Sequence, residues 1–344
     1  MKTFHCDKCD GVLFFENVVC GRCGEAVAFL PGQGALVTLA GKDIRPCRNY
    51  AQENVCNWAV PADDPDDYCL SCRLTRVIPD LTQPGFKAAW FRMEGAKRRM
   101  VYTLLDLGLP VVSKAIDPAQ GLAFEFKADV PSDTGEPVLT GHDEGLITLN
   151  VAEADDAERE KRRVQMHEPY RTLLGHFRHE IGHYYWDRLI RDSPQLADFR
   201  ARFGDESADY AESLQRHYDQ GPPADWQQSF VSGYATSHPW EDWAETWAHY
   251  LHLIDCLDTA AACGIRLQPA HSEEPVIRAI NPDPANESFG KLSRDWFALT
   301  YVLNNLNRSM GLPNAYPFLL PKPMLAKLRF VHGVVTGSRV AAAA

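Results

Sequence analysis

The chain has 344 residues, 45% of them hydrophobic, so it is long enough to bury a core and to form two or three domains. Its formal net charge of −11 makes nucleic acid a poor partner, because an acidic surface gains little from counterion release. The first ten residues are polar, and no apolar run of membrane-spanning length follows. We therefore expect a soluble, cytoplasmic protein with no membrane contact.

Eight of the ten cysteines lie in the first 72 residues, and in a reducing compartment such clustering favours metal over disulfides. Four of them form two C-x-x-C pairs ten residues apart, the pattern of a zinc ribbon: Cys6, Cys9, Cys20 and Cys23. Two such pairs supply four thiolates to one tetrahedral ion. A second set has this spacing only in its last pair: Cys47, Cys56, Cys69 and Cys72. We predict two structural zinc sites, with reduced, metal-free thiols as the alternative.

These cysteines define a predicted zinc-ribbon region over residues 1–80. A shell closed by four thiolates leaves no open position for chemistry, so both sites should hold the region together rather than catalyse. The region has eight basic and eleven acidic residues. This negative balance favours protein contact or scaffolding over DNA binding.

Hydrophobic periodicity predicts the elements of the middle of the chain. Apolar residues recur at helical spacing over residues 86–107, and alternation predicts a strand over 122–130. Residues 145–150, which follow a Gly/Asp-rich turn, are also predicted to form a strand. We interpret the basic face of the first helix as solvated, with contact to an acidic partner as the alternative: Lys87, Arg92, Lys97, Arg98 and Arg99.

The most informative stretch is His179-Glu180-Ile181-Gly182-His183, on a helix predicted over residues 169–190. Residues four apart share one face of a helix, so both imidazoles can bind one zinc ion. Glu180 projects about 100° away from His179. It can therefore act as general base toward a water rather than as a ligand.

A catalytic zinc also needs a third protein ligand and one open position. A later helix, predicted to begin near Pro239, places Glu241, Glu245 and His249 along one stripe. Glu241 is the preferred ligand, and Glu245 would then accept the free N–H of a ligating histidine. The alternative puts Glu245 on the metal. Asp242 is a weaker candidate because it is shorter and faces another direction.

These motifs together resemble the gluzincins. The metzincins do not fit, because Trp186 and Leu189 stand where their motif needs Gly and His. The run from Glu241 to Glu245 is similar to the E-x-x-A-E of lethal-factor-type gluzincins, whose first glutamate is the ligand. The resemblance implies that Tyr234, seven residues before Glu241, faces the oxyanion. Other possible donors are Tyr316, His238 and Arg308.

More narrowly, the chain resembles a bacterial family of zinc-binding metallopeptidases with an N-terminal zinc ribbon. The resemblance includes the ribbon cysteines and residues 145–150, 170–186 and 238–250. It implies an α+β fold, in which the ribbon head precedes a mainly helical, zincin-like domain over residues 81–335 with a small sheet. Residues 146–150 would be the edge strand of that sheet, where an extended peptide can pair, and an ordinary sheet strand is the alternative. Residues 336–344 should form a disordered tail.

The sequence therefore predicts zinc-dependent hydrolysis of peptide bonds, with one catalytic and two structural zinc ions. The expected partner is a peptide or protein substrate, and the ribbons could bind a further protein. One alternative is a zinc hydrolase of a non-peptide amide. Another is a zinc-ribbon adaptor whose histidine site is inactive.

Overall fold

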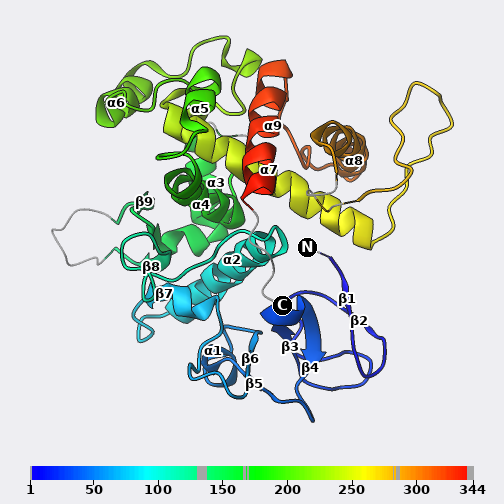
Figure 1. Cartoon of the computed structure of the whole chain (residues 1–344). Helices are drawn as coiled ribbons and strands as arrows, with labels where there is room; N and C mark the ends of the chain where they lie inside the picture. The colour runs from blue at the N-terminus through cyan, green and yellow to red at the C-terminus, as the bar shows by residue number, and fades with distance from the viewer. Residues whose placement is uncertain are drawn as a thin grey trace. The chain divides into compact units, whose positions relative to one another are not determined.

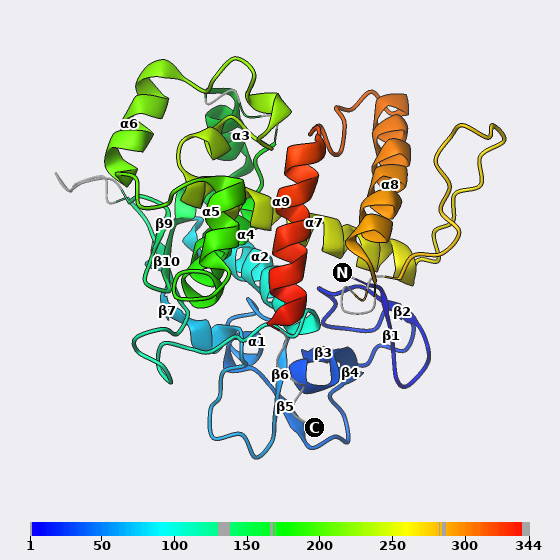
Figure 2. The same cartoon turned by 45° about the horizontal axis from the view of Figure 1, so that its top comes forward.

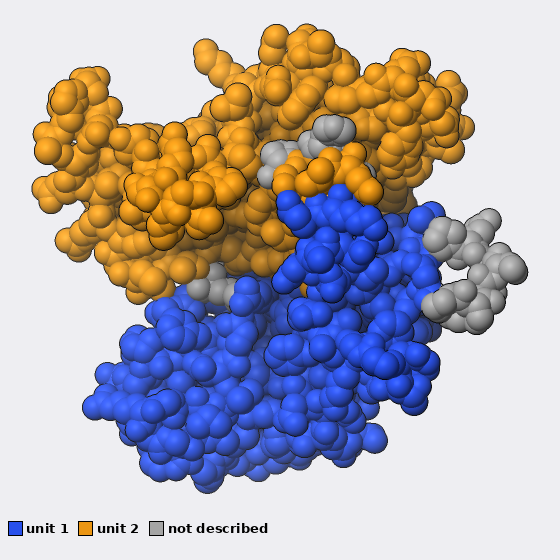
Figure 3. Space-filling view, turned by 180° about the vertical axis from the view of Figure 1, so that it is seen from behind, with its two compact units in different colours: residues 1–162 blue, residues 163–344 orange. Residues whose placement is uncertain are grey.

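The computed structural model describes residues 2–129, 138–165, 168, 170–281, 283 and 287–338 (Figure 1). The chain divides into two compact units, residues 1–162 and 163–344, which Figure 3 shows in different colours. The boundary falls inside helix α3 (Asp156–Gln165). The first unit therefore holds both cysteine sets, and the second holds the H-E-x-x-H motif. The fold is of the α+β class, as the sequence predicts.

The cysteine-rich part of the first unit is built from three short antiparallel strand pairs. They are β1 (Phe4–His5) with β2 (Val12–Leu13), β3 (Val27–Leu30) with β4 (Ala35–Thr38), and β5 (Ile44–Pro46) with β6 (Ala59–Pro61). The short helix α1 (Arg48–Ala51) follows β5. Isolated two-stranded pairs are marginally stable in water, so this region needs further support.

An aromatic core supplies part of that support. Phe15 and Phe29 have ring centroids 5.4 Å apart, and Phe29 lies 4.8 Å from Trp58. Tyr102 joins this core from helix α2 (Phe86–Asp106), with its ring 5.3 Å from that of Phe15. The ribbon strands therefore pack on α2 within the same unit.

A four-stranded sheet accompanies α2 in the first unit, with the strand order β7-β8-β10-β9. Its strands are β7 (Thr75–Val77), β8 (Ala123–Lys127), β9 (Gly141–Asp143) and β10 (Leu146–Asn150). β8 pairs in parallel with β7 and β10, and β9 pairs antiparallel with β10. The helix predicted over 86–107 and the strands predicted near 122–130 and 145–150 are confirmed.

Two predictions for this unit are wrong. Strand β10 is internal rather than an edge, because the turn at Glu144 and Gly145 folds β9 back onto its free side. The basic face of α2 is not wholly solvated, because Lys97 is fully buried and Arg98 is only 4% exposed. Lys97 pairs with Glu94 at 2.9 Å, which offsets the cost of burying both charges.

The second unit is helical (Figures 1 and 2). Its helices are α4 (Leu173–Leu189), α5 (Leu196–Phe203), α6 (Tyr210–Gln220), α7 (Pro239–Ala262), α8 (Phe289–Ser309) and α9 (Lys322–Gly337). Helix α7 contacts α4, α5, α8 and α9, so it forms the centre of the unit. Three tryptophans of α7 and α8 are almost fully buried, namely Trp243, Trp247 and Trp296.

The helix boundaries differ from prediction at two places. Helix α4 begins at Leu173 rather than near 169, because the Thr172 side chain accepts a hydrogen bond from the Gly175 N–H and caps it. Helix α9 extends to Gly337, so residues 336 and 337 of the predicted tail are helical. Pro169 and tail residues 339–344 lie outside the described residues. None of the described helices is long and apolar enough to cross a membrane.

Candidate metal centre

Helix α4 places His179 and His183 against Glu241 of α7, and the two helices approach closely at Gly182. A Cβ added to Gly182 would lie 3.0 Å from the Cα of Ala244. Trp243 donates from Nε1 to the Gly182 carbonyl at 2.9 Å, which fixes the pair of helices at this point. The glycine inside the motif therefore brings the two histidines within reach of α7.

The predicted ligands of the catalytic zinc come together at this crossing. Glu241, in the first turn of α7, places Oε2 3.0 Å from Nε2 of His179 and Oε1 3.5 Å from Nε2 of His183. One ligand atom from each of these three residues lies within 4.8 Å of the others. Two imidazole nitrogens and a carboxylate oxygen form a donor set that suits zinc.

The electrostatics at His179 also favour a cation. Burial lowers the pKa of His179, but its contacts with Glu241 and Glu245 outweigh burial and raise the pKa well above its ordinary value. The two carboxylates thus create a strongly negative environment at a site where Glu241 is only 1% exposed. The residues present therefore fit a divalent metal ion.

Glu245 lies one turn beyond Glu241 and contacts the other nitrogen of the same imidazole. Its Oε1 is 2.7 Å from Nδ1 of His179, and its Oε2 accepts a hydrogen bond from the Ser232 hydroxyl at 2.7 Å. Burial would raise the pKa of Glu245, but the hydrogen bond to His179 dominates and lowers it to about 2. A carboxylate held in this way fixes the orientation and tautomer of the ring.

Glu180 is the buried carboxyl group next to this cluster in sequence. It is 8% exposed, and burial raises its pKa. A raised pKa suits a carboxyl group that takes up and releases a proton near neutral pH.

Two tyrosines border the cluster, and only one of them is predicted from the sequence. The ring of Tyr234 lies 6.0 Å from that of His179. The missed residue is Tyr210, at the start of α6, whose hydroxyl donates to Oε1 of Glu241 at 2.6 Å. No spacing links residues 31 positions apart, so no sequence signal identifies Tyr210. Ser232 is missed for the same reason.

The other oxyanion candidates make contacts of their own. His238 caps α7, where its Nδ1 accepts from the Trp240 N–H at 3.1 Å. The Tyr316 hydroxyl lies 2.8 Å from Nδ1 of His249. Arg308 donates from Nε to the Asn304 carbonyl at 3.2 Å. These contacts favour a structural role for each of the three.

The first cysteine set also converges, and it is partly exposed. Its four sulfur atoms lie within 4.8 Å of one another: Cys6, Cys9, Cys20 and Cys23. Cys6 and Cys20 are buried, whereas Cys9 and Cys23 are partly accessible. All ten cysteines are free thiols in the structure.

The second cysteine set converges equally well, and all four of its members are buried: Cys47, Cys56, Cys69 and Cys72. The guanidinium of Arg98, from α2, accompanies it inside the first unit. Burial lowers the pKa of Arg98, but attraction to Cys56 and Glu94 outweighs burial and raises it. A buried cation at this place would offset part of the negative charge of four thiolates.

Comparison with known families matches nearly the whole chain. Residues 86–334 match the family described as "Putative zinc-binding metallo-peptidase". The chain belongs to this metallopeptidase family. Residues 3–83 match a zinc-ribbon domain, so the chain carries the N-terminal ribbon that its cysteines predict.

Similar chains occur in mycobacteria. An uncharacterized protein of Mycobacterium bovis is 49% identical over 337 residues, which is 97% of this chain and 95% of the relative. Uncharacterized proteins from two strains of Mycobacterium tuberculosis match to the same extent. No solved structure is significantly similar to the chain.

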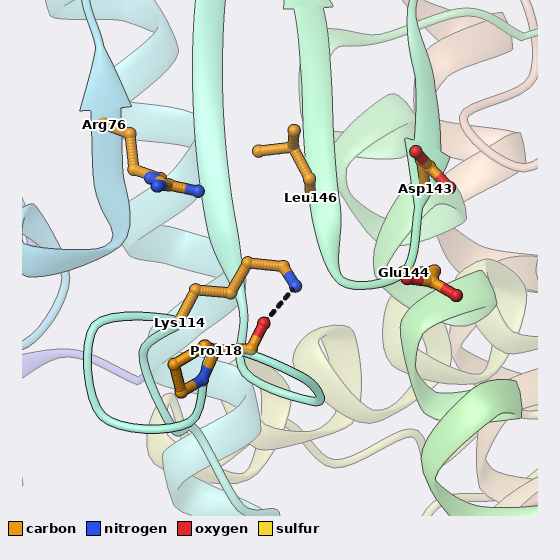
Figure 4. A pocket seen from close by; sticks show the side chains of 6 residues that line it. All are labelled: Arg76, Lys114, Pro118, Asp143, Glu144 and Leu146. Carbon is orange, nitrogen blue, oxygen red and sulfur yellow. Dashed lines mark hydrogen bonds between the residues drawn. The ribbon is translucent and has the colours of Figure 1, made fainter.

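The first unit also has a pocket of about 260 Å³ (Figure 4). It is lined by Arg76, Lys114, Pro118, Asp143, Glu144 and Leu146. Lys114 donates to the Pro118 carbonyl at 3.0 Å, as the dashed line in Figure 4 shows. The lining of this pocket includes none of the residues of the three metal-ligand groups, so we assign the pocket no part in metal chemistry.

Proposed function

We propose that the chain is a zinc-dependent peptidase in which His179, His183 and Glu241 hold the metal and Glu180 is the general base. The observation that carries this proposal is that one ligand atom each from His179, His183 and Glu241 lies within 4.8 Å of the others, and that helix α4, which holds the two histidines, also carries Glu180. A purely structural metal site has no use for a carboxyl group in that position. Membership of a zinc-binding metallopeptidase family supports the same conclusion.

The proposed chemistry divides into a contribution of the ion and contributions of the chain. Zinc, when bound, lowers the pKa of a water toward about 7 and polarises the scissile carbonyl. The carboxylate of Glu180 accepts a proton from the attacking water and passes it to the nitrogen of the leaving amine. Tyr234 is the proposed hydrogen-bond donor to the oxyanion.

Side chains around the ligands keep them in place. Glu245 and Ser232 hold the ring of His179 in the orientation that directs Nε2 toward Glu241. Tyr210 occupies Oε1 of Glu241, which leaves Oε2 as the oxygen nearest to His179. The site is thus organised before any substrate binds.

The two four-cysteine groups are proposed to hold one structural zinc each, giving three ions per chain. Free thiols grouped in fours suit a reducing compartment, so we place the reaction in the cytoplasm. A peptide or protein is the proposed substrate. A protein partner of the ribbon region is a separate, weaker proposal, because nothing in the contacts of that region indicates its chemistry.

Replacement of Glu180 by Gln tests the proposed mechanism. The variant should keep the same zinc content, because Glu180 is not a ligand, and should lose about 10²–10⁴-fold in hydrolysis of a peptide library. Glu212→Gln, in the exposed face of α6, is the matched control and should hydrolyse at the wild-type rate. Wild-type hydrolysis by Glu180→Gln would refute the mechanism. Cleavage of acylated small amines but not peptides would favour the non-peptide alternative.

A further inference from the structure

Lys327, on α9, is a buried lysine that none of the motifs includes. It is 5% exposed, and its Nζ donates to Oδ2 of Asp242 at 2.6 Å and to the Ser229 carbonyl at 2.8 Å. Its ammonium group also lies 4.1 Å from the ring centroid of Phe230. Apolar residues often replace such buried ion pairs without loss of stability. The pair is therefore better explained by the positions it fixes than by its contribution to the free energy of unfolding.

The two hydrogen bonds of Lys327 connect two segments that both reach the candidate metal centre. Asp242 follows Glu241 directly in the first turn of α7. Ser229 begins the segment 229–236, whose Ser232 donates to Glu245 at 2.7 Å. Tyr234, in the same segment, lies beside His179.

The far side of this segment is held by packing. Val231 is only 2% exposed, and Phe230 lies under the ammonium of Lys327. Ser232 also accepts a hydrogen bond from the Ala235 N–H at 3.1 Å, which shapes the turn that carries Tyr234. Movement at Ser229 would therefore be transmitted to Ser232 and Tyr234.

We propose that Lys327 is a positioning residue for the metal centre. By tying Asp242 to the Ser229 carbonyl, its ammonium keeps Glu241 and the Ser232–Glu245 pair in register with His179. The inference rests on the metal site of the proposed function, but it does not depend on peptide hydrolysis. Under this inference, helix α9 helps to position the metal ligands, although it begins about 80 residues after the first turn of α7.

Lys327→Met separates this role from ordinary packing. Methionine keeps a long, apolar side chain against Phe203 and Phe230, but it removes the positive charge and both hydrogen bonds of the lysine. Lys322→Met, at the exposed start of the same helix, is the matched control. The double variant Lys327→Met with Asp242→Asn leaves no unpaired buried carboxylate and serves if the single variant fails to fold.

Three readouts apply to these variants, with His183→Ala as the reference that lacks the third ion. The first is zinc affinity at the histidine site by chelator competition. The second is the absorption spectrum of Co²⁺ at that site, and the third is hydrogen exchange of residues 229–236 in metal-free protein. Lys327→Met should bind zinc about tenfold more weakly, change the Co²⁺ spectrum and exchange faster, as loss of support around a ligand does. Lys322→Met should match wild type in all three.

The outcomes distinguish this inference from the proposed function. A Lys327→Met or double variant with reduced thermal stability but wild-type zinc affinity and spectrum would overturn the positioning role. Wild-type protein that binds the third zinc without cleaving peptides would refute only the peptidase. Wild-type protein with no zinc at the histidines would overturn both.

Discussion

Tyr210→Phe removes one hydroxyl from the surroundings of the metal centre. That hydroxyl donates to Oε1 of Glu241 at 2.6 Å. Hydrogen bonds to charged groups contribute about 1.5–3 kcal/mol. Tyr210 is 39% exposed, so water can replace its hydroxyl, and we expect the lower end of this range, about 1.5 kcal/mol. At about 1.4 kcal/mol per tenfold change in an equilibrium constant, zinc should bind about tenfold more weakly.

The assay is chelator competition for the histidine-site zinc, followed for Tyr210→Phe, wild type and Tyr218→Phe. Tyr218 lies two turns along the same helix and is 61% exposed, so its hydroxyl is the matched control. Zinc at the cysteine sites should be unaffected in every case. Wild-type affinity in Tyr210→Phe would refute the argument that α6 helps to orient Glu241. An equal loss in Tyr218→Phe would show a general effect of α6 instead.

Three further predictions concern packing, pH and the second cysteine set. Gly182→Ala should destabilise the fold by about 1–3 kcal/mol in chemical denaturation, because its Cβ would lie 3.0 Å from the Cα of Ala244. Gly95→Ala, where no atom lies within 4 Å, should instead stabilise by up to about 1 kcal/mol, and a loss equal to that of Gly182→Ala would contradict the packing argument. Burial lowers the pKa of His249 from 6.5 to about 4, so the unfolded chain takes up its proton first as pH falls. Stability should then be lost between about pH 6.5 and 4, by up to about 3 kcal/mol, and His249→Leu should flatten this slope in denaturation measured across that range. Arg98→Met should speed zinc release to a chelator from the second cysteine site only, and unchanged release would mean that the guanidinium does not offset the thiolate charge.

The sequence predicts best where the relevant residues share one element. The four-residue spacing of His179 and His183, and of Glu241 and Glu245, is set by the helix itself, so periodicity alone places each pair on a face. The cysteine spacing works in the same way, because each C-x-x-C pair is a local turn. Even the choice between Glu241 and Glu245 could be argued from spacing. In the structure Glu241 faces Nε2 of both histidines, whereas Glu245 contacts Nδ1 of His179.

Contacts between distant segments are where prediction from sequence ends. Tyr210 and Ser232 reach their glutamates from segments that no periodicity relates to α7. The burial of Lys97 depends on Glu94 and on the rings of Phe124 and Phe126 in β8, which a helical pattern does not reveal. The prediction that residues 146–150 form an edge strand is wrong for a similar reason.

Strand β10 shows that physical reason clearly. The sequence predicts that residues 146–150 form a strand, but a strand's own pattern does not say how many neighbours it has. The neighbour β9 is only three residues long, too short for a clear alternating pattern. The sequence of β10 therefore does not determine its place in the sheet.

Zinc content per chain tests the central claim most directly. Wild type, His183→Ala and the exposed-histidine control His271→Ala would be analysed together by elemental analysis. Three zinc ions in wild type and in His271→Ala, falling to two in His183→Ala, is the result that two cysteine sites and one histidine–glutamate site predict. Two zinc ions in all three proteins would contradict a metal centre at His179, His183 and Glu241, and with it the proposed peptidase.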